Sequence, residues 1–461
     1  MNQKPEKQTK RSFQSPKGTR DFYPQEMLRR RYIVDAWRRV ALRHGFEEID
    51  GPTFEHLDLY TVKSGEGIIS ELFSFQRAGG EDVYALRPEF TPTLARMYAA
   101  RARQLPQPTK WFCVSNFFRA ERPQRGRLRE FFQWNCDVIA GEDAEDGDVE
   151  VIHAAIAVMS DCGLDASVVS AHLNDRRVLT AWAAQNGIDP SRHDEFLRIV
   201  DVRAKNPAEC DARLRAMSID PGAFGALLAS PTDSADISDS SSLRSVLAAR
   251  RRLSGAGLDE WATIDLSLAR GLAYYTGMVF EVIAQGERAV AGGGRYDNLI
   301  ELFGGPPTPA CGFGMGDVVL ANLLEDRGLM PEGRELLEAL SRPMPLRPDV
   351  FVVSTGKDGA DEQVVPLVAR LRRGEEAEGW RERGVRPWGA GRYSVPPLHA
   401  RRSYKQTKNI GKLLGDAGAC HARFCVIIEN SERCTLKDLD RGEQSEGVAL
   451  AEVGARVSAA R

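Results

Sequence analysis

The segment between Phe118 and Gln133, FRAERPQRGRLREFFQ, combines many arginines with aromatic residues in a pattern that few folds can accommodate. Pro123 and Gly126 mark a turn, so the segment predicts two strands joined by a loop. Arginines suit phosphates, an aromatic ring suits a base or sugar, and the polar end of the strand suits a small substrate. This strand therefore predicts the floor of a ligand-binding site. The alternative is a solvated edge strand. Since side chains alternate along a strand, one face of the second strand is expected to carry Arg127, Arg129, Phe131, Gln133, Asn135 and Asp137.

The composition is that of an ordinary globular protein with several domains. A chain of 461 residues is too long for one typical domain, and 42% hydrophobic residues suffice for buried cores. The net charge of −3 gives no overall basic field, so any contact with nucleic acid must come from local patches. The first residues lack the apolar stretch of a signal peptide, and no later run reaches the length of a membrane span. We therefore expect a soluble, cytoplasmic protein that does not contact membranes.

The cysteines are scattered along the chain. None of the eight forms a C-x-x-C pair, and the chain contains no HExxH motif. Scattered cysteines in a chain of this size are most often buried free thiols. The sequence therefore predicts buried thiols and no structural or catalytic metal site.

Hydrophobic periodicity and turn residues divide the chain into segments of different character. Apolar residues between Glu26 and His44 recur at the spacing of one helix face, and residues 83–137 indicate an antiparallel sheet interrupted by a helix. The expected fold class is α/β, with an α+β core on an antiparallel sheet, a helical insertion and a C-terminal α/β unit. The expected boundaries are 1–14 for a disordered tail, 15–174 and 261–328 for the two parts of the core, 175–260 for the helical insertion, 329–348 for a proline-bearing linker and 349–461 for the C-terminal unit.

Five segments, in this order along the chain, resemble motifs of the histidyl-tRNA synthetases, which are class II aminoacyl-tRNA synthetases. The similarity is collinear from about Lys17 to Glu446 and weaker in the insertion and the C-terminal unit. It implies that the chain activates histidine with ATP to histidyl-adenylate and transfers it to the 3′ end of tRNA(His). The segments are KGTRD (17–21), LRPEFT (86–91), Phe118–Gln133, LARGLAYYTG (268–277) and GGGRYD (292–297).

The resemblance also implies roles for individual residues. Adenylation needs no protein nucleophile, only positioning and a cationic clamp on the developing phosphorane charge, with Mg²⁺ at the phosphates. Arg119 and Arg270 are the expected catalytic clamp on the α-phosphate. A carboxylate and a phenol suit the donor and acceptor nitrogens of neutral imidazole. The expected histidine-binding residues are Glu89, Thr91, Gln133, Asp137, Tyr275 and Tyr296. The expected ATP-binding residues are Arg119, Glu121, Arg127, Phe131 and Arg270.

The sequence departs from the family pattern at three positions. Class II enzymes end motif 3 in an arginine for the ATP γ-phosphate, and here Val319 stands at that position, with Arg127 as a candidate substitute. Ala273 stands where many relatives carry Asp, and Asp137 where many carry Glu. The shorter Asp137 must reach farther or use a bridging water.

The basic run 401–409 in the C-terminal unit resembles the start of a helix in the family's anticodon-binding domain. We expect a basic helix over 402–414, with tRNA contacts from Arg402, Lys405 and Lys408; the alternative is a solvated charged face. Class II cores pair through the motif 1 region, here about residues 27–52, so a homodimer is expected. Two other functions stay open at this point: a regulatory, histidine-binding paralogue with weak or no aminoacylation activity, and an RNA-binding module without activity.

Overall fold

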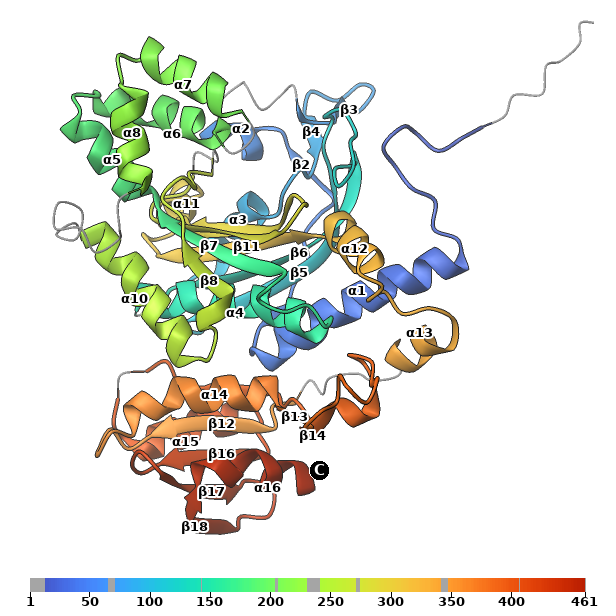
Figure 1. Ribbon diagram of the computed structural model, residues 1–461, viewed down its shortest axis with the longest axis vertical. Helices are drawn as coiled ribbons and strands as arrows, with labels where there is room; N and C mark the ends of the chain where they lie inside the picture. Colours follow the sequence, from blue (N-terminus) through green and yellow to red (C-terminus); the bar gives the residue numbers. More distant parts are fainter. Residues whose placement is uncertain are drawn as a thin grey trace, which may run out of the picture.

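The computed structural model describes residues 13–64, 71–141, 143–203, 206–229, 241–270, 274–340, 347–405 and 407–460. It confirms the α/β fold class, since helices cover two separate sheets, one of eight strands and one of five. In Figure 1 the larger sheet and its helices form the upper body, and the smaller sheet forms the lower body, drawn in orange and red. Within the described residues, no helix is long and apolar enough to cross a membrane.

The eight-stranded sheet has the order β1-β5-β6-β11-β10-β9-β7-β8. Its six central strands are antiparallel neighbours, whereas β1 pairs with β5, and β8 with β7, in parallel. The predicted antiparallel core sheet is therefore confirmed. Its strands are β1 (Glu47–Glu48), β5 (Thr109–Phe118), β6 (Glu130–Ile139), β7 (Val169–Asp175), β8 (Ala262–Ile264), β9 (Met278–Ala284), β10 (Ala289–Arg295) and β11 (Ala310–Gly316).

Four helices pack against one face of this sheet: α1 (Pro24–Arg43), α4 (Ala144–Asp161), α10 (Ser241–Gly255) and α12 (Asp317–Asp326). The apolar spacing predicted for the first helix is buried as expected, and Trp37 stacks on Trp134 of β6 with ring centroids 6.3 Å apart. Asp143 caps α4 by accepting from the amides of residues 145 and 146. On the opposite face, α3 (Thr91–Arg101) and the short α11 (Leu299–Leu302) pack together and leave the centre of the sheet open.

Between β7 and β8 the chain forms a group of helices with an apolar core of its own, in which Leu179, Phe196 and Phe224 are buried. The Ser- and Asp-rich stretch expected as a surface loop lies mostly outside the described residues. A three-stranded sheet, β2-β4-β3, follows α1 along the chain, and the short helix α2 (Asp58–Ser64) lies beside this sheet. The helices of the group are α5 (Arg176–Gln185), α6 (His193–Val202), α7 (Pro207–Ala216), α8 (Pro221–Ala229) and α10 (Ser241–Gly255), and the strands are β2 (Phe54–His56), β3 (Ser74–Gln76) and β4 (Val83–Leu86).

The lower body is a five-stranded sheet with the order β15-β12-β16-β17-β18. The helix α13 (Gly333–Leu340), in the segment expected to be a linker, packs on α1, while residues 341–346, with Pro343 and Pro345, lie outside the described residues. A two-stranded sheet pairs β13 (Glu375–Glu376) with β14 (Tyr393–Val395). The strands of the larger sheet are β12 (Val350–Ser354), β15 (Ala400–Arg402), β16 (Phe424–Ile428), β17 (Arg433–Asp438) and β18 (Gln444–Ala449), and the helices are α14 (Val364–Arg373), α15 (Ile410–Ala419) and α16 (Val453–Ala459).

The basic helix predicted over 402–414 is wrong. Arg402 ends β15, which pairs in parallel with β12, and the helix α15 begins only at Ile410. Asn409 sets this start, because its side chain accepts a hydrogen bond from the amide of Lys412. The basic residues before the cap therefore belong to a strand and a loop. The prediction of buried thiols is confirmed, since all the cysteines are free and all but the half-buried Cys420 are buried.

Candidate active site

Three glycines at the centre of the large sheet make room for polar side chains. A Cβ atom on Gly312 would lie 1.9 Å from Oδ1 of Asp137, and one on Gly314 would lie 2.0 Å from Nε2 of Gln133. A Cβ atom on Gly292 of the neighbouring strand would lie 1.6 Å from Nη1 of Arg270. Glycine is therefore required at these positions by the close approach of the side chains above it. The glycine-rich strands β10 and β11 form the floor of a cavity.

This small cavity gathers the residues that the sequence indicated for the amino acid. It is closed on one side by β6 and on the other by α3 and the segment after residue 273. All six expected histidine-binding residues line it, together with Asn135, which alternation placed on the same face of the strand, and Tyr274, which the sequence did not indicate as a site residue. The lining residues are Glu89, Thr91, Arg119, Gln133, Asn135, Asp137, Arg270, Tyr274, Tyr275, Gly292, Tyr296, Gly312, Phe313 and Gly314.

Asp137 and Tyr296 form a buried hydrogen bond at the bottom of the small cavity. The Tyr296 hydroxyl donates to Oδ1 of Asp137 at 2.5 Å, and the two residues are 1% and 4% exposed. Burial raises the pKa of Asp137 to about 7, and the hydrogen bond from Tyr296 acts in the opposite direction. The second carboxylate oxygen is not used by that hydrogen bond, so it can accept from a ligand.

A second carboxylate, Glu89, lies at the other end of the cavity. The hydroxyl of Tyr274 donates to its Oε2 at 2.7 Å. Burial raises the pKa of Glu89, while the Tyr274 hydrogen bond and the charges of Arg119 and Arg270 lower it. The charges of the two arginines favour the ionised carboxylate, which can receive a cationic group.

Three buried side-chain atoms around the cavity lack a hydrogen-bond partner among the described residues: Oε1 of Gln133, Nδ2 of Asn135 and Nε of Arg270. Leaving such groups unpaired costs about 1–3 kcal/mol each, so native proteins usually satisfy them with water or a ligand. One acceptor and two donors therefore point to a small polar ligand as the natural occupant.

A larger cavity of about 590 Å³ adjoins the small one, and its size is in the range of ligand pockets. The loop between β5 and β6 forms one wall with Glu121 and Arg127, which form an ion pair with each other. The helix α6 forms the opposite wall with Arg198 and Asp201, which sequence reasoning did not indicate. The sequence did not point to these two residues, because α6 is far along the chain from the other site residues and belongs to the helical group between β7 and β8.

Glu89, Arg119 and Arg270 line both cavities, so they mark the junction between them. Nε of Arg119 donates to the carbonyl of Pro88 at 3.1 Å, and its guanidinium lies 5.1 Å from the ring centroid of Phe131. Phe131 thus lies beneath Arg119 and packs against another ring, Phe117. Two cations at the point where the cavities meet can stabilise an anion that reacts there.

Arg270 holds its position through an unusual backbone conformation. Its φ angle of 45° lies in the left-handed region, which non-glycine residues rarely adopt. Its Nη1 donates to Oε1 of Glu281 on β9 at 2.8 Å, and its guanidinium lies 5.7 Å from the ring centroid of Tyr275. Backbone conformations of this kind persist where the surrounding contacts fix them, often at functional sites.

The position expected for an arginine in motif 3 is occupied by buried Val319, which is 7% exposed. Its Cγ2 would lie 3.2 Å from a Cβ atom on Gly126, so the valine packs closely under the tip of the β5–β6 loop. Two positions earlier, Asp317 accepts from Arg20 at 2.7 Å and from the amide of Phe132 at 3.0 Å. This carboxylate therefore ties the N-terminal segment to β6, which forms one side of the small cavity. Ala273, the other departure noted in the sequence, lies outside the described residues.

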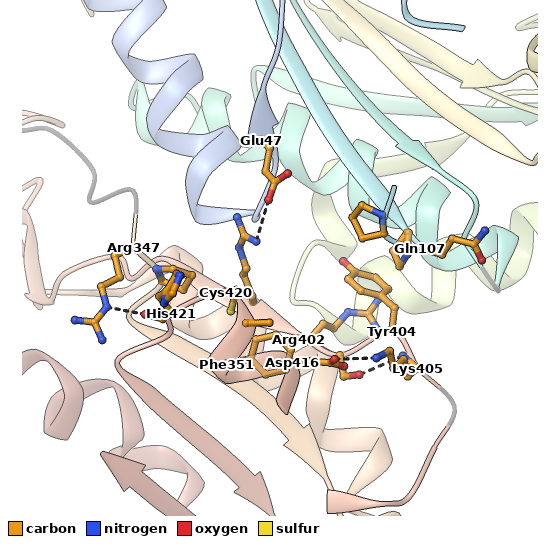
Figure 2. A pocket seen from close by; sticks show the side chains of 16 residues that line it. Glu47, Gln107, Arg347, Phe351, Arg402, Tyr404, Lys405, Asp416, Cys420 and His421 are labelled. Carbon is orange, nitrogen blue, oxygen red and sulfur yellow. Dashed lines mark hydrogen bonds and ion pairs between the residues drawn. The ribbon is translucent and has the colours of Figure 1, made fainter. Parts of the chain in front are cut away.

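The three basic residues expected to contact tRNA each have a carboxylate partner. Arg402 pairs with Asp146 of α4 at 3.1 Å, and its guanidinium lies 4.1 Å from the ring centroid of Tyr404. Lys405 pairs with Asp416 at 2.8 Å, and Lys408 pairs with Asp361. Arg402, Tyr404 and Lys405 line a cleft of about 830 Å³ between the two bodies, with Glu47 on the opposite side (Figure 2).

The comparisons with known proteins agree with one another. A family model described as histidyl-tRNA synthetase matches residues 18–317. The chain is 36% identical over 455 residues to the histidine–tRNA ligase of Haloarcula marismortui, with 94% of this chain and 95% of that protein covered. It is 33% identical over 451 residues to the histidine–tRNA ligase of Thermococcus kodakarensis, with 93% and 94% covered. The solved histidyl-tRNA synthetase of a Nostoc species has a TM-score of 0.59 at 24% identity, covering 98% of this chain and 100% of that one, which supports the fold.

Proposed function

The chain belongs to the histidyl-tRNA synthetase family, and we propose that it is a histidine–tRNA ligase that uses the two joined cavities to bring histidine and ATP together. The observation that carries this proposal is the sharing of Glu89, Arg119 and Arg270 by both cavities. An amino acid in the small cavity and a nucleotide in the large one would meet at these residues. The reaction needs that meeting point, since the histidine carboxylate must attack the α-phosphorus of ATP.

The small cavity suits histidine in charge and in hydrogen bonding. We propose that Glu89 receives the α-ammonium group beside Thr91, while Asp137 accepts the imidazole N–H. The free amide oxygen of Gln133 offers a further acceptor, and Tyr275 and Tyr296 enclose the ring. A pocket built on such bonds rejects an amino acid without the ring nitrogens, because its buried polar groups would be left unpaired.

The large cavity suits ATP. Arg119 and Arg270 would hold the α-phosphate and stabilise the negative charge that develops on it during attack, so that pyrophosphate leaves. We propose that Glu121 contacts the adenine end and that Arg127 contacts the distal phosphates in place of the arginine that Val319 replaces. Phe131 is among the lining residues of neither cavity, and we propose that it reaches the adenine from its place beneath Arg119. The adenylate then passes its acyl group to a terminal hydroxyl of the tRNA, and AMP leaves with the electrons of the broken acyl–phosphate bond.

Mg²⁺ accompanies ATP in reactions of this kind, and it would neutralise phosphate charge and orient the leaving pyrophosphate. Within the described part of the chain, no group of three or more His, Cys, Asp or Glu residues is placed to hold a metal ion. The carboxylates of Asp265 and Glu281 do line the large cavity. Because Asp265 already pairs with His172 and Glu281 with Arg270, an ion that arrives with the nucleotide would take most of its ligands from phosphates and water.

We propose that tRNA(His) is the nucleic-acid partner, that the protein acts in the cytoplasm and that two copies pair. One face of the β2-β4-β3 sheet supports pairing, because Phe54 and Phe75 are 48% and 43% exposed there, with their ring centroids 5.6 Å apart. We also propose the domain division given above, with 349–461 as the anticodon-binding domain. Lys405 and Lys408 are the more accessible candidates for tRNA contact, since Arg402 has only 11% of its side chain exposed.

Histidine-dependent exchange of pyrophosphate into ATP tests this function directly. Exchange with histidine, and none with the other standard amino acids, supports the ligase. Histidine binding without exchange would instead identify a regulatory, histidine-sensing protein. Exchange driven equally well by another amino acid would refute the assignment of the small cavity.

A further inference from the structure

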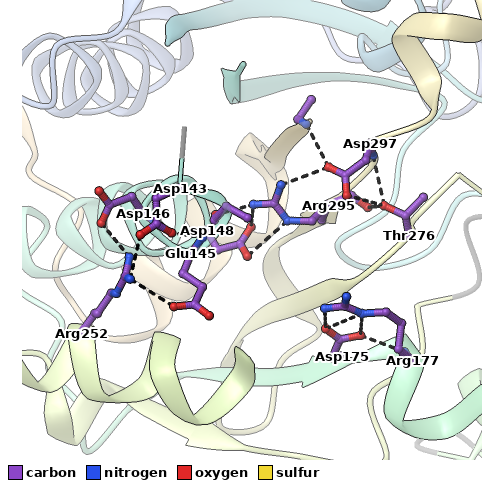
Figure 3. A network of polar contacts seen from close by, with 12 residues as sticks. Asp143, Glu145, Asp146, Asp148, Asp175, Arg177, Arg252, Thr276, Arg295 and Asp297 are labelled. Carbon is purple, nitrogen blue, oxygen red and sulfur yellow. Dashed lines mark hydrogen bonds and ion pairs between the residues drawn. The ribbon is translucent and has the colours of Figure 1, made fainter. Parts of the chain in front are cut away.

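A buried charged cluster lies directly behind the small cavity. Arg295, the last residue of β10, points away from the cavity and pairs with Asp148 of α4, with Nη2 and Oδ1 2.7 Å apart and Nε and Oδ2 3.4 Å apart. Only 7% and 6% of these two side chains are exposed. Figure 3 shows the pair at the centre of a polar network that runs from α4 to the end of β10.

The same guanidinium also fixes the chain on the far side of Tyr296. Nη1 of Arg295 donates to Oδ1 of Asp297 at 3.0 Å, and Nη2 donates to the carbonyl of Ala144. Asp297 in turn accepts from the amide of Ala310 at 3.1 Å. Two residues that flank Tyr296 are thus joined to each other, and Arg295 anchors them to α4 while Asp297 anchors them to β11.

A third connection reaches the segment that carries Tyr275. The amide of Thr276 donates to the carbonyl of Arg295 at 2.8 Å, and the Thr276 hydroxyl accepts from the amide of Asp297 at 3.1 Å. The backbone on both sides of Tyr296 and the residue after Tyr275 therefore converge on one buried arginine. Tyr296 lies between the two anchored residues and points the other way, to Asp137.

We propose that Asp148 and Arg295 are positioning residues for amino-acid recognition, which hold Tyr296 so that its hydroxyl orients the Asp137 carboxylate. This inference rests on the proposed function, because it assigns Asp137 to the substrate ring. The physical reason is geometric: a shift of the 295–297 backbone by a few tenths of an ångström would be transmitted to a 2.5 Å hydrogen bond. An ionised, nearly two-pronged pair in a dry environment is the rigid support that such a bond requires.

The test measures pyrophosphate exchange by the full-length protein carrying Asp148→Asn, Tyr296→Phe or both. Asp148→Asn should raise the KM for histidine about 10-fold while the KM for ATP stays within about twofold, as expected for losing one ion-supported hydrogen bond. Tyr296→Phe should give a similar rise. In the double variant the two effects should not multiply, because both act through the same Asp137 contact.

A matched control lies on the same helix. Asp161 of α4 pairs with buried Arg43 at 2.9 Å and lines neither cavity, so Asp161→Asn tests the loss of a comparable ion pair without a link to the site. If Asp148→Asn fails to fold, Arg295→Lys provides the same test, since lysine keeps the charge but cannot bridge Asp148 and Asp297 together.

The outcomes separate the two levels of inference. The positioning role would be overturned if Asp148→Asn had the same KM for histidine as Asp161→Asn. It would also be overturned if the effects of Asp148→Asn and Tyr296→Phe multiplied in the double variant. A wild-type protein without histidine-dependent exchange would instead refute the proposed function. In that case calorimetric titration of histidine into the same variants still decides the positioning role: equal affinities for wild type and Asp148→Asn would overturn it.

Discussion

Nη1 of Arg372 in the lower body lies 2.8 Å from Oε1 of Glu150 in the upper body, and both side chains are almost fully buried. Lys110 reaches the same oxygen at 3.1 Å, and the ring of His44 contacts it at 3.0 Å. Burial acts to raise the pKa of Glu150, but the positive charges of Arg372 and Lys110 hold this pKa well below its ordinary value. Tyr404 completes the cluster by donating to the other carboxylate oxygen at 3.1 Å. The two bodies therefore share one buried ionic cluster.

Removal of Arg372 should destabilise the protein strongly. Arg372→Met keeps much of the aliphatic volume but leaves Glu150 with one fewer buried cation, and loss of one partner of a buried pair costs about 3–5 kcal/mol. The midpoint of denaturation by urea should fall accordingly. The control is Arg401→Met, whose partner Glu47 is 3.6 Å away and 60% exposed, so that its loss should cost less than about 1 kcal/mol. Equal midpoints for the two variants would show that the buried cluster does not hold the bodies together.

A methyl group on the floor of the small cavity should abolish amino-acid binding selectively. Gly312→Ala would place its Cβ 1.9 Å from the Asp137 carboxylate, which must then move. We expect the KM for histidine to rise at least ~10-fold, with little change in the KM for ATP. Gly316→Ala on the same strand is the matched control, because nothing lies within 4 Å of its added Cβ. Similar kinetics for both variants would place the amino acid elsewhere.

Loss of the cation at the cavity junction should affect the rate of adenylation. Arg270→Ala should lower the rate of pyrophosphate exchange by ~10²–10³, the usual cost of removing one donor that stabilises the transition state. The fold should change little, which circular dichroism can verify. Arg250→Ala removes an arginine of α10 that pairs with Asp259 and lines neither cavity, and it should retain the wild-type rate. A near wild-type rate for Arg270→Ala would show that another group supplies the clamp.

The strand β6 shows where sequence reasoning succeeds. Alternation predicted one face for Gln133, Asn135 and Asp137, and all three line the small cavity on β6. Alternation did not extend to Arg127 and Arg129, because the strand begins only at Glu130. Local periodicity is reliable within an element but does not determine where that element starts.

Contacts between distant segments escape such reasoning. Tyr274 and Tyr275 are adjacent, and in a strand they would face opposite ways, yet both line the small cavity because this segment is irregular. The lining of the large cavity by α6 and the pairing of Asp148 with Arg295 depend on how separate elements pack. Residue types alone carry no signal of that packing. The same holds for Arg402, which a basic run suggested for tRNA and which the fold directs to Asp146.

The buried carboxylate of Asp137 should make the unliganded protein less stable as the pH rises. Burial raises its pKa to about 7 in the folded protein, whereas the same group titrates near ~3.9 in an unfolded chain. Between these values the folded state binds more protons than the unfolded state. The free energy of unfolding therefore falls as pH rises through this window, and the loss is complete above about 7.

Asp137→Asn removes this titration, so the comparison of the two proteins isolates it from every other group. Between pH 5 and pH 8 the wild type should lose about 2–3 kcal/mol more stability than the variant, which denaturation midpoints at the two pH values can measure. Glu89 in the cavity and Asp148 behind it also have pKa values raised by burial, that of Asp148 to about 6, but both groups are present in both proteins and cancel. Saturating histidine should reduce the loss in the wild type, because the ring N–H supplies the ionised carboxylate with a donor. Parallel pH profiles for the two unliganded proteins would mean that Asp137 is already ionised at pH 5. The difference in histidine affinity between the wild type and Asp137→Asn should then also be independent of pH.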